Sequence, residues 1–257
     1  MQRANSATVD PLRIDASGRG GSIAEQVFRT LRASIVTMRL TPATALSEQD
    51  IADRLKVSRQ PVREAFIKLS DIGLVRVMPQ RGTFVVKIST RAVMDARFVR
   101  EAVECAIARR ASEGIGKQAA DALSAIITDQ RKAAKSANLE EFFVLDEAFH
   151  RGLANAAECD HAWKVIEEAK AQMDRVRFLS IPDATPIGRL IVQHQAILDA
   201  IAAGRGAAAE KAMRDHLGEI LRSLPRLSRA FPDMFEDTDE ATPNTPARKP
   251  ARKKAKD

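Results

Sequence analysis

Three of the four histidines in this chain lie where helical stretches carry their apolar residues. Asp146 and His150 are four residues apart in LDEAFH, a spacing that places both side chains on one face of a helix. His194 in IVQHQAILDAI and His216 in KAMRDHLGEI share a helix face with aliphatic residues, which directs them into the protein. One carboxylate and three imidazoles suit a divalent transition metal such as Zn, Ni or Mn. The sequence therefore predicts a metal site formed by Asp146, His150, His194 and His216.

A second group of polar side chains opens the stretch KVSRQPVREAF. Ser58 is placed to cap a helix, and Pro61 suits the first turn because no backbone hydrogen bond is lost there. Arg59, Gln60 and Arg63 then project from the exposed N-terminal turn. Arginine paired with guanine O6 and N7 is the commonest specific contact in the major groove, and a recognition helix reads bases with its N-terminal residues. We therefore expect this helix to enter the major groove of double-stranded DNA.

The surrounding residues, 22–88, have the pattern of a winged helix-turn-helix DNA-binding domain. A helix begins near residue 22 and is ended by Pro42, and a second helix follows a cap at Ser47. The third helix runs from Ser58 to about residue 72 and stops at Gly73. Two β-branched runs, LVRVM and TFVVKI, flank the turn PQRG and predict a hairpin.

Residues 89–232 show no further strand pattern and predict an all-α bundle of six helical stretches. The boundaries are marked by glycines, by Asn138 and Asp160, and by the segment IPDATP. His161 follows one boundary and is interpreted as a surface or capping residue. The stretches are Thr90–Glu113, Lys117–Ala137, Leu139–Ala157, His161–Leu179, Pro186–Ala203 and Ala207–Leu224. The expected fold class is mainly α, with a winged helix-turn-helix followed by a six-helix bundle that binds a ligand.

Basic charge is concentrated in the N-terminal part of the chain and in its tail. The formal net charge is +7. Residues 22–88 hold 11 basic and 6 acidic residues, whereas residues 89–232 hold 21 and 20. Residues 1–21 are expected to form a flexible leader, and residues 233–257 a disordered tail that is first acidic and then basic. This distribution indicates an anionic polymer as the partner of the N-terminal part, with the tail adding non-specific affinity for DNA.

The composition disfavours membrane and secreted proteins. No apolar run approaches the roughly 20 residues of a membrane helix, and the N-terminus lacks the apolar core of a secretory signal. Cys105 and Cys159 form no C-x-x-C pair, so we interpret them as small buried residues of a cytosolic protein. We therefore expect a cytoplasmic protein without a membrane partner.

The run LSEQDIADRLKVSRQPVREAFIKLSDIGLVRVMPQRGTFV closely resembles the N-terminal winged helix of GntR-family transcription regulators. The resemblance implies that Arg59 and Arg63 read bases, and that Gly82 in the wing reaches the adjacent minor groove. Because two-fold dimers read inverted repeats, we expect a homodimer on a symmetric operator in the bacterial nucleoid. The residues expected to contact DNA are Gln49, Lys56, Ser58, Arg59, Gln60, Arg63, Arg81 and Gly82.

Two residues depart from the family pattern. Relatives often have Arg at the position of Gln49, and glutamine cannot reproduce a bidentate contact to guanine. Relatives often have Gly at the position of Lys56, where lysine adds a phosphate contact but is unfavourable if the backbone is left-handed.

Four elements of the helical region resemble the FCD domain, the ligand-binding domain of the FadR subgroup of these regulators. They are VREAVE, LDEAFHRGLANAA, HQAILDAI and MRDHL, which span about residues 95–217, and six helices correspond to the VanR-like version. The resemblance implies a metal held by the four residues named above and a small carboxylate effector in its open coordination positions. Arg100 is expected beside the effector, with an ion pair to Glu104 as the alternative role. Arg175 and Arg177 are further candidates for the pocket.

These features predict a metabolite-responsive repressor that its effector releases from DNA. A metal-dependent enzyme acting on a small organic acid is one alternative, because open metal positions can activate water. No further Glu or His suggests a general base beside the expected ligands, which disfavours an enzyme. An architectural DNA-binding protein is the other alternative, suggested by the basic tail, but the large helical region before the tail favours sensing.

Overall fold

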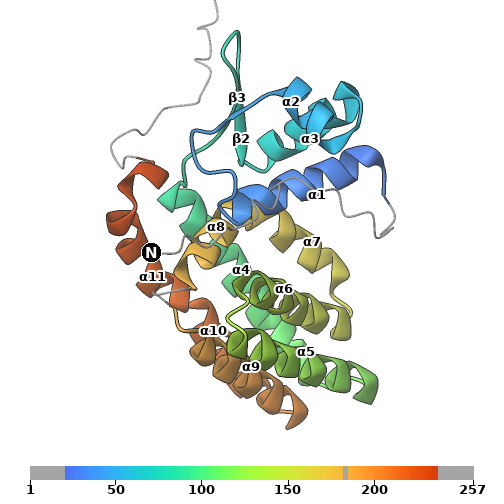
Figure 1. The fold of residues 1–257 in the computed structure, drawn as a ribbon. Helices are drawn as coiled ribbons and strands as arrows, with labels where there is room; N and C mark the ends of the chain where they lie inside the picture. Colours follow the sequence, from blue (N-terminus) through green and yellow to red (C-terminus); the bar gives the residue numbers. More distant parts are fainter. Residues whose placement is uncertain (1–20, 182–184, 237–257) are drawn as a thin grey trace, which may run out of the picture.

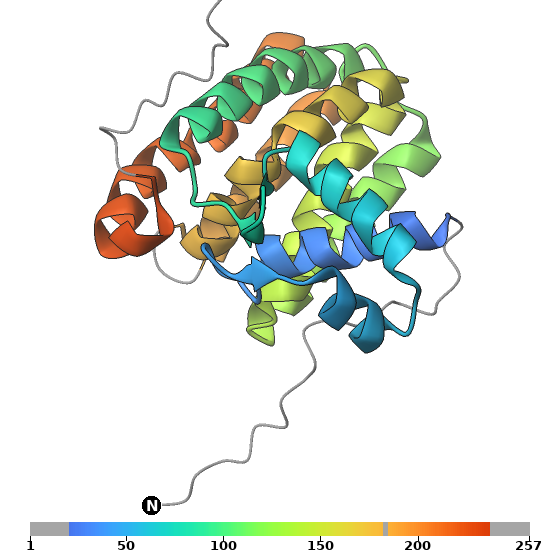
Figure 2. The same cartoon turned by 90° about the horizontal axis from the view of Figure 1, so that it is seen from above.

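The computed structural model describes residues 21–181 and 185–236, which form two parts stacked on one another (Figure 1). Three helices and a short sheet form one end of the molecule, and a bundle of helices forms the other. Seen from above, the N-terminal helices lie over one end of the bundle (Figure 2). Within the described residues, no helix is long and apolar enough to cross a membrane.

The N-terminal part has the elements of a winged helix-turn-helix. Its helices are α1 (Ile23–Val36), α2 (Glu48–Leu55) and α3 (Arg59–Asp71), and its strands are β1 (Ala45–Leu46), β2 (Val75–Met78) and β3 (Gly82–Val85). The strands form an antiparallel sheet in the order β1-β3-β2, with Val77 opposite Thr83 in the hairpin. The Ser47 hydroxyl accepts a hydrogen bond from the Asp50 amide at 3.2 Å and caps α2. The three helices and the hairpin are confirmed, and β1 was not predicted because two residues carry no periodicity.

The first helix ends earlier than expected. Val36 is the last residue of α1, and Met38 takes a left-handed conformation with φ 58°. The Leu40 amide then donates to the Ser34 carbonyl at 2.9 Å, so the chain has turned back before it reaches Pro42. The prediction that Pro42 ends this helix is therefore wrong.

The six predicted helical stretches are present, and two of them are divided. One breaks at Gly218, a poor helix former. The other breaks at Lys170, where the sequence has no Gly or Pro but the ammonium is buried and lies 2.8 Å from Glu147 Oε2. The helices are α4 (Thr90–Ala111), α5 (Lys117–Lys135), α6 (Leu139–Ala156), α7 (Asp160–Ala169), α8 (Ala171–Ser180), α9 (Ile187–Ala202), α10 (Gly206–Leu217) and α11 (Glu219–Ala230).

Helix α8 belongs to the apolar cores of both parts. Ala171 packs into the core of the winged part, which is otherwise formed by residues of α1 to β3. Met173 and Val176 pack into a small cluster with apolar residues of α4 and α11. Most of the bundle core lies further along, between α4, α5, α6, α9 and α10. This helix therefore joins the N-terminal part to the bundle.

The chain leaves the bundle beside the place where it entered. Ile88, between β3 and α4, forms a parallel bridge with Phe235, and both side chains are buried. The Ile88 amide donates to the Met234 carbonyl at 2.8 Å, and the Glu236 amide donates to the Ile88 carbonyl at 3.0 Å. The fold thus continues four residues into the predicted tail of 233–257. Residues 237–257 of that tail, and residues 1–20 of the predicted leader, lie outside the described residues.

Lys56, the residue that departs from the family pattern between α2 and α3, has φ 55° and ψ 44°. Replacing Lys56 with Gly should raise the free energy of unfolding by about 0.5–1 kcal/mol, since glycine adopts this left-handed conformation without a steric cost. Lys164 is the matched control, because it is exposed within the regular helix α7. Lys164→Gly should lower the free energy of unfolding by about 1 kcal/mol in urea titrations. Equal destabilisation by both substitutions would contradict the strain assigned to Lys56.

Candidate functional site

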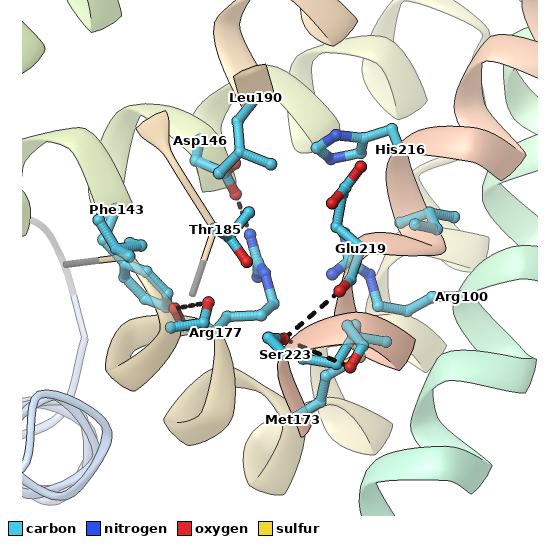
Figure 3. Close-up of a pocket in the computed structure, with 14 residues that line it drawn as sticks. Arg100, Phe143, Asp146, Met173, Arg177, Thr185, Leu190, His216, Glu219 and Ser223 are labelled. Atoms are coloured by element: carbon cyan, nitrogen blue, oxygen red, sulfur yellow. Dashed lines mark hydrogen bonds and ion pairs between the residues drawn. The ribbon is translucent and has the colours of Figure 1, made fainter. Parts of the chain in front are cut away.

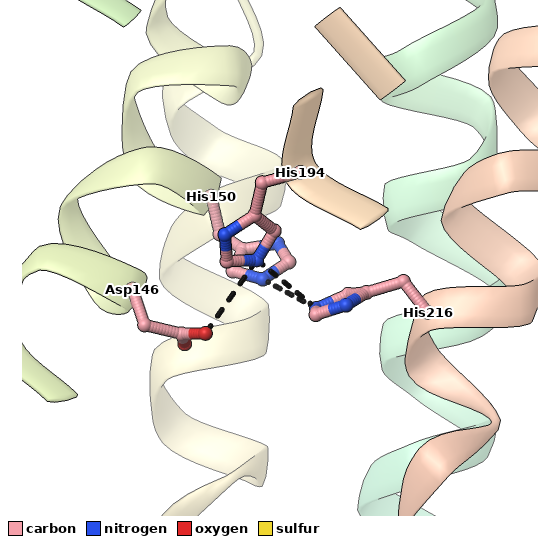
Figure 4. A group of neighbouring side chains, drawn as sticks. All are labelled: Asp146, His150, His194 and His216. Carbon is pink, nitrogen blue, oxygen red and sulfur yellow. Dashed lines mark hydrogen bonds and ion pairs between the residues drawn. The ribbon is translucent and has the colours of Figure 1, made fainter. Parts of the chain in front are cut away.

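Asp146 and His150 on α6, His194 on α9 and His216 on α10 meet inside the bundle (Figure 4). All four side chains are buried, and one ligand atom from each lies within 4.8 Å of the others. His216 Nε2 lies 3.1 Å from His150 Nε2 and 3.4 Å from His194 Nε2. His194 Nε2 lies 3.5 Å from Asp146 Oδ1. The structure thus brings together all four residues expected to hold a metal.

Each of the three imidazoles faces an oxygen with its other ring nitrogen. The pairs are His150 Nδ1 with Glu104 Oε2 at 2.5 Å, His194 Nδ1 with Gln130 Oε1 at 2.9 Å, and His216 Nδ1 with Gln193 Oε1 at 3.1 Å. The two amides are oriented by their other ends, since Gln130 Nε2 donates to the Leu145 carbonyl and Gln193 Nε2 donates to Glu219. A proton on the Nδ1 of His194 and of His216 satisfies the two glutamine oxygens, whereas His150 Nδ1 is in ion-pair contact with Glu104 without the geometry of a hydrogen bond. The three Nε2 atoms are then left with lone pairs that point at one another.

This arrangement fits a divalent metal. Lone pairs that face one another at 3.1–3.4 Å repel unless a cation lies between them. Ligand atoms about 2.1 Å from one metal lie about 3 Å from each other, which agrees with the spacing of the Nε2 atoms. Oxygen partners at the opposite ring nitrogens are also typical of metal-binding histidines, because they fix the tautomer and the ring orientation.

Burial keeps two histidines of this cluster in the neutral state that a metal needs. It lowers the pKa of His194 and of His216 well below the ordinary value, and neighbouring histidines and arginines lower both further. Burial alone would raise the pKa of Glu104, but Arg100 and His150 outweigh it and hold that pKa well below its usual range. These two rings are therefore neutral, and Glu104 is a charged acceptor.

A small cavity opens beside the cluster, with Asp146 and His216 in its wall (Figure 3). Its volume is about 40 Å³, which is room for two or three water-sized groups and therefore for a carboxylate group. Arg100 reaches this cavity from α4, and Arg177 reaches it from α8. The remaining polar residues of the wall are Ser180, Thr185, Glu219 and Ser223.

Arg177 is the cation placed most directly toward the metal cluster. Its Nη2 forms an ion pair with Asp146, and its Nη1 donates to Asp174 Oδ1 at 2.9 Å. Burial lowers its pKa well below the ordinary value, and the nearby Arg100 lowers it further. An anion that entered the cavity would give this largely buried guanidinium a further charged partner beside Asp146 and Asp174.

Of the three arginines expected in the pocket, Arg100 and Arg177 line it and Arg175 does not. Arg100 lines the cavity and also forms the alternative ion pair, with its Nε 2.5 Å from Glu104 Oε1. Arg175 does not line it, because its Nη1 donates to the Val86 carbonyl at 2.9 Å and to Gln172 Oε1 at 3.1 Å. Residues two apart on a helix point to nearly opposite sides, so Arg175 faces the winged part while Arg177 faces the cavity. The expectation for Arg175 is wrong for this reason.

Sequence reasoning missed the oxygens that orient the histidines. Glu104 was considered only as a partner of Arg100, although it also contacts His150. Gln130 and Gln193 could not be predicted as partners of the histidines. Glutamine is common on helices, and it orients a histidine only where packing brings two helices together. Glu219, three residues after His216, could have been found from its place one helical turn beyond a ligand.

In the winged part, Glu48 holds both arginines of the recognition helix. Arg59 Nη2 donates to Glu48 Oε2 at 3.0 Å, and Arg63 donates to both Glu48 oxygens at 3.0 and 3.1 Å. The hydrogen bond from Arg63 lowers the pKa of Glu48 against the opposing effect of partial burial. The side chains of Arg59 and Arg63 are still 57% and 55% exposed, so both remain accessible to a groove.

The other residues expected to contact DNA are also exposed. Ser58 occupies the N-cap position of α3, although its hydroxyl makes no capping hydrogen bond. Gln49 and Gln60 each bond to a carboxylate one turn further along their own helix. Arg81 and Gly82 lie at the tip of the wing, where Gly82 has φ 106° and so requires glycine. Together with Lys56, these side chains come from α2, α3 and the wing.

The depressed pKa values of His194 and His216 predict how stability depends on pH. Below about pH 6.5 the unfolded chain takes up protons that the folded chain refuses, so unfolding becomes easier as the pH falls. Each histidine should contribute up to about 1.4 kcal/mol per pH unit in metal-free protein, and nothing above its unfolded pKa. Thermal unfolding between pH 5 and 8 should show a shallower slope for His194→Gln, while exposed His161→Gln keeps the wild-type slope. Identical slopes in all three proteins would contradict the assignment.

Comparison with known proteins identifies both parts. The family model described as "Bacterial regulatory proteins, gntR family" matches residues 23–85, and the model described as "FCD domain" matches residues 95–219. HTH-type transcriptional repressor RspR of Escherichia coli (strain K12) is 42% identical over 213 residues, which cover 83% of this chain and 93% of that protein. An uncharacterized HTH-type transcriptional regulator in an unstable DNA locus of Streptomyces ambofaciens is 35% identical over 229 residues, covering 88% of this chain and 95% of that protein.

Solved structures share the fold at lower identity. McbR/YncC of E. coli superposes with a TM-score of 0.71 at 18% identity, covering 82% of this chain and all of that one. A GntR-type regulator from Rhodococcus sp. RHA1 gives a TM-score of 0.65 at 24% identity, covering 77% of this chain and 97% of that one. The matched family and the named relatives regulate transcription, so the enzyme considered from the sequence is excluded. The chain belongs to the GntR family of bacterial transcription regulators, with an FCD domain after its winged helix-turn-helix.

Proposed function

We propose that this protein is a metabolite-responsive repressor whose FCD domain binds a small carboxylate through a divalent metal. The three Nε2 atoms that converge beside a cavity with two arginines are the observation that carries the proposal. A relative 42% identical to this chain is named a transcriptional repressor, which supports the sign of regulation. We place the protein in the FadR subgroup, with residues 22–88 as the DNA-binding domain and residues 89–232 as the effector domain.

Asp146, His150, His194 and His216 would hold the metal, with Glu104, Gln130 and Gln193 orienting the rings. When bound, a Zn, Ni or Mn ion supplies a Lewis-acid position for a carboxylate oxygen. Arg100 and Arg177 supply positive charge in the wall of the same cavity. The small volume favours an effector whose carboxylate enters the cavity while the rest of the molecule stays outside it.

On DNA, the arginines of the recognition helix would exchange a carboxylate partner for the acceptor edge of a base. Arg59 and Arg63 are held by Glu48 in the free protein, and each guanidinium can donate instead to guanine O6 and N7 in the major groove. Gln49, Lys56, Ser58, Gln60, Arg81 and Gly82 would contact neighbouring bases, phosphates and the minor groove. Because one chain offers one recognition helix, a homodimer is the form that would read an inverted repeat.

The metal and effector are tested together. Protein purified without chelator should contain about one divalent metal per chain by elemental analysis. A thermal-shift screen of small organic acids should then find acids that raise the Tm of loaded wild-type protein, since a ligand of the folded state stabilises it. His194→Ala should lose both the metal and the shift, whereas His161→Ala, which changes an exposed histidine, should keep both. Negligible metal in wild-type protein, or a normal shift in His194→Ala, would rule out this site.

Base reading by the recognition helix is tested on an operator selected from random DNA. Arg63→Ala should weaken binding to the selected site by about 1–3 kcal/mol and relax discrimination at one base pair. Lys68→Ala removes the same charge from the last turn of α3, where Lys68 pairs with Glu25, and should leave discrimination intact. If Arg63→Ala lowered affinity for random DNA by the same amount, Arg63 would contact only phosphate.

A further inference from the structure

Asp174 on α8 is a fully buried carboxylate shared by three cations. It accepts hydrogen bonds from Arg32 Nη2 at 2.8 Å, from Lys170 Nζ at 2.6 Å and from Arg177 Nη1 at 2.9 Å. Arg32 belongs to α1 of the DNA-binding part, whereas Arg177 reaches the cavity of the FCD domain. One carboxylate therefore contacts both parts of the protein.

The contacts continue to the proposed metal site. Arg177 forms a second ion pair, with Asp146, which is one of the four candidate metal ligands. Arg32, Asp174, Arg177 and Asp146 thus form an unbroken series of charge pairs, which we call the α8 ion-pair chain. Asp174 is 0% exposed, and the side chains of Asp146 and Arg177 are 4% and 14% exposed.

Charges in this series compete for partners. A buried charge that loses its partner is strongly destabilising. If one charge of the series loses a partner, its remaining ion pairs therefore become stronger. If Asp146 gives its charge to a metal, Arg177 depends more on Asp174, which lies 2.9 Å from its Nη1, and to a smaller extent on Glu147 at 3.8 Å. If an anion in the cavity pairs with Arg177, Asp174 depends more on Arg32 and Lys170. In both cases the strength of the Arg32–Asp174 contact between the two parts changes.

Two further hydrogen bonds attach α8 to the DNA-binding part. Gln172 donates to the Gly73 carbonyl, just after α3, and Arg175 donates to the Val86 carbonyl, just after β3. A shift of α8 would therefore be felt at α1, at the end of the recognition helix and at the base of the wing. No comparable chain runs through Arg39 and Glu140, an ion pair between the same two parts whose side chains are 40% and 49% exposed.

We infer that Asp174 and Arg177 are the residues that couple the occupancy of the FCD cavity to the docking of α1, through the α8 ion-pair chain. This inference rests on the proposed metal site, because the chain ends on one of its ligands. A ligand can change DNA binding only if some contact differs between the occupied and the empty protein. The inference places that contact on α8.

Hydrogen–deuterium exchange of the full chain, with Zn²⁺ alone as the probe, tests the coupling. In chelator-stripped wild-type protein, Zn²⁺ should slow exchange around His194 and His216 and also change exchange in α1. Arg32→Gln should keep the slowing around the histidines and lose the change in α1. Arg32→Lys, which preserves the charge, should recover part of it. Arg39→Gln removes the exposed ion pair between the two parts and should behave as wild type.

The two hypotheses fail differently. The coupling is overturned, and the metal site stands, in either of two cases. In the first, Zn²⁺ slows amide exchange around His194 in wild type but does not change exchange in α1. In the second, Arg32→Gln shows the same change in α1 as wild type. If Zn²⁺ changes exchange in neither region, the metal site is wrong and the coupling falls with it.

Discussion

Burying three imidazoles away from water is the constraint on which the helical part depends. Every buried ring nitrogen needs a partner, and an unsatisfied one costs about 1–3 kcal/mol. The Nδ1 atoms of His194 and His216 find theirs in Gln130 on α5 and Gln193 on α9, and His150 Nδ1 contacts Glu104 on α4, while the rings themselves come from α6, α9 and α10. Five helices must therefore pack in one register for the cluster to be satisfied. Most of the apolar core of the bundle is drawn from the same five helices, so packing and polar pairing reinforce each other.

Helical periodicity was enough to predict the cluster but not its surroundings. The spacing of Asp146 and His150 fixed their common face, and the aliphatic neighbours of His194 and His216 showed that both point inward. Periodicity also implies that Arg175 and Arg177 face opposite ways, but only the packed structure decides which of them meets the cavity. Two helix boundaries could not be predicted from Gly or Pro. The division at Lys170 coincides with an ion pair to Glu147, which is distant in sequence. The early end of α1 coincides with a local backbone turn that contains neither Gly nor Pro.

For the recognition helix too, the sequence indicated the functional side chains but not the residue that holds them. Its arginines were recognisable from the cap and the first turn, whereas Glu48 lies in the preceding helix and carried no signal. By holding both guanidinium groups, Glu48 restricts their rotamers before DNA is met, which lowers the entropy lost on binding. In the proposed base contact it would also set a competition, since a guanine would have to replace a carboxylate that is already well paired. Both effects favour discrimination between sites over indiscriminate affinity.

The bridge between Ile88 and Phe235 has a consequence for how such regulators diversify. Because the chain enters and leaves the FCD domain at one point, the whole segment between these residues behaves as an insert with adjacent ends. To exchange this segment between relatives, only two contacts with the DNA-binding part would have to be preserved. They are the Ile88–Phe235 bridge and the face of α8 that carries Gln172, Asp174 and Arg175. A domain of different ligand specificity could therefore be joined to an existing DNA-binding domain if this small junction were conserved, while the interior of the exchanged domain is free to change.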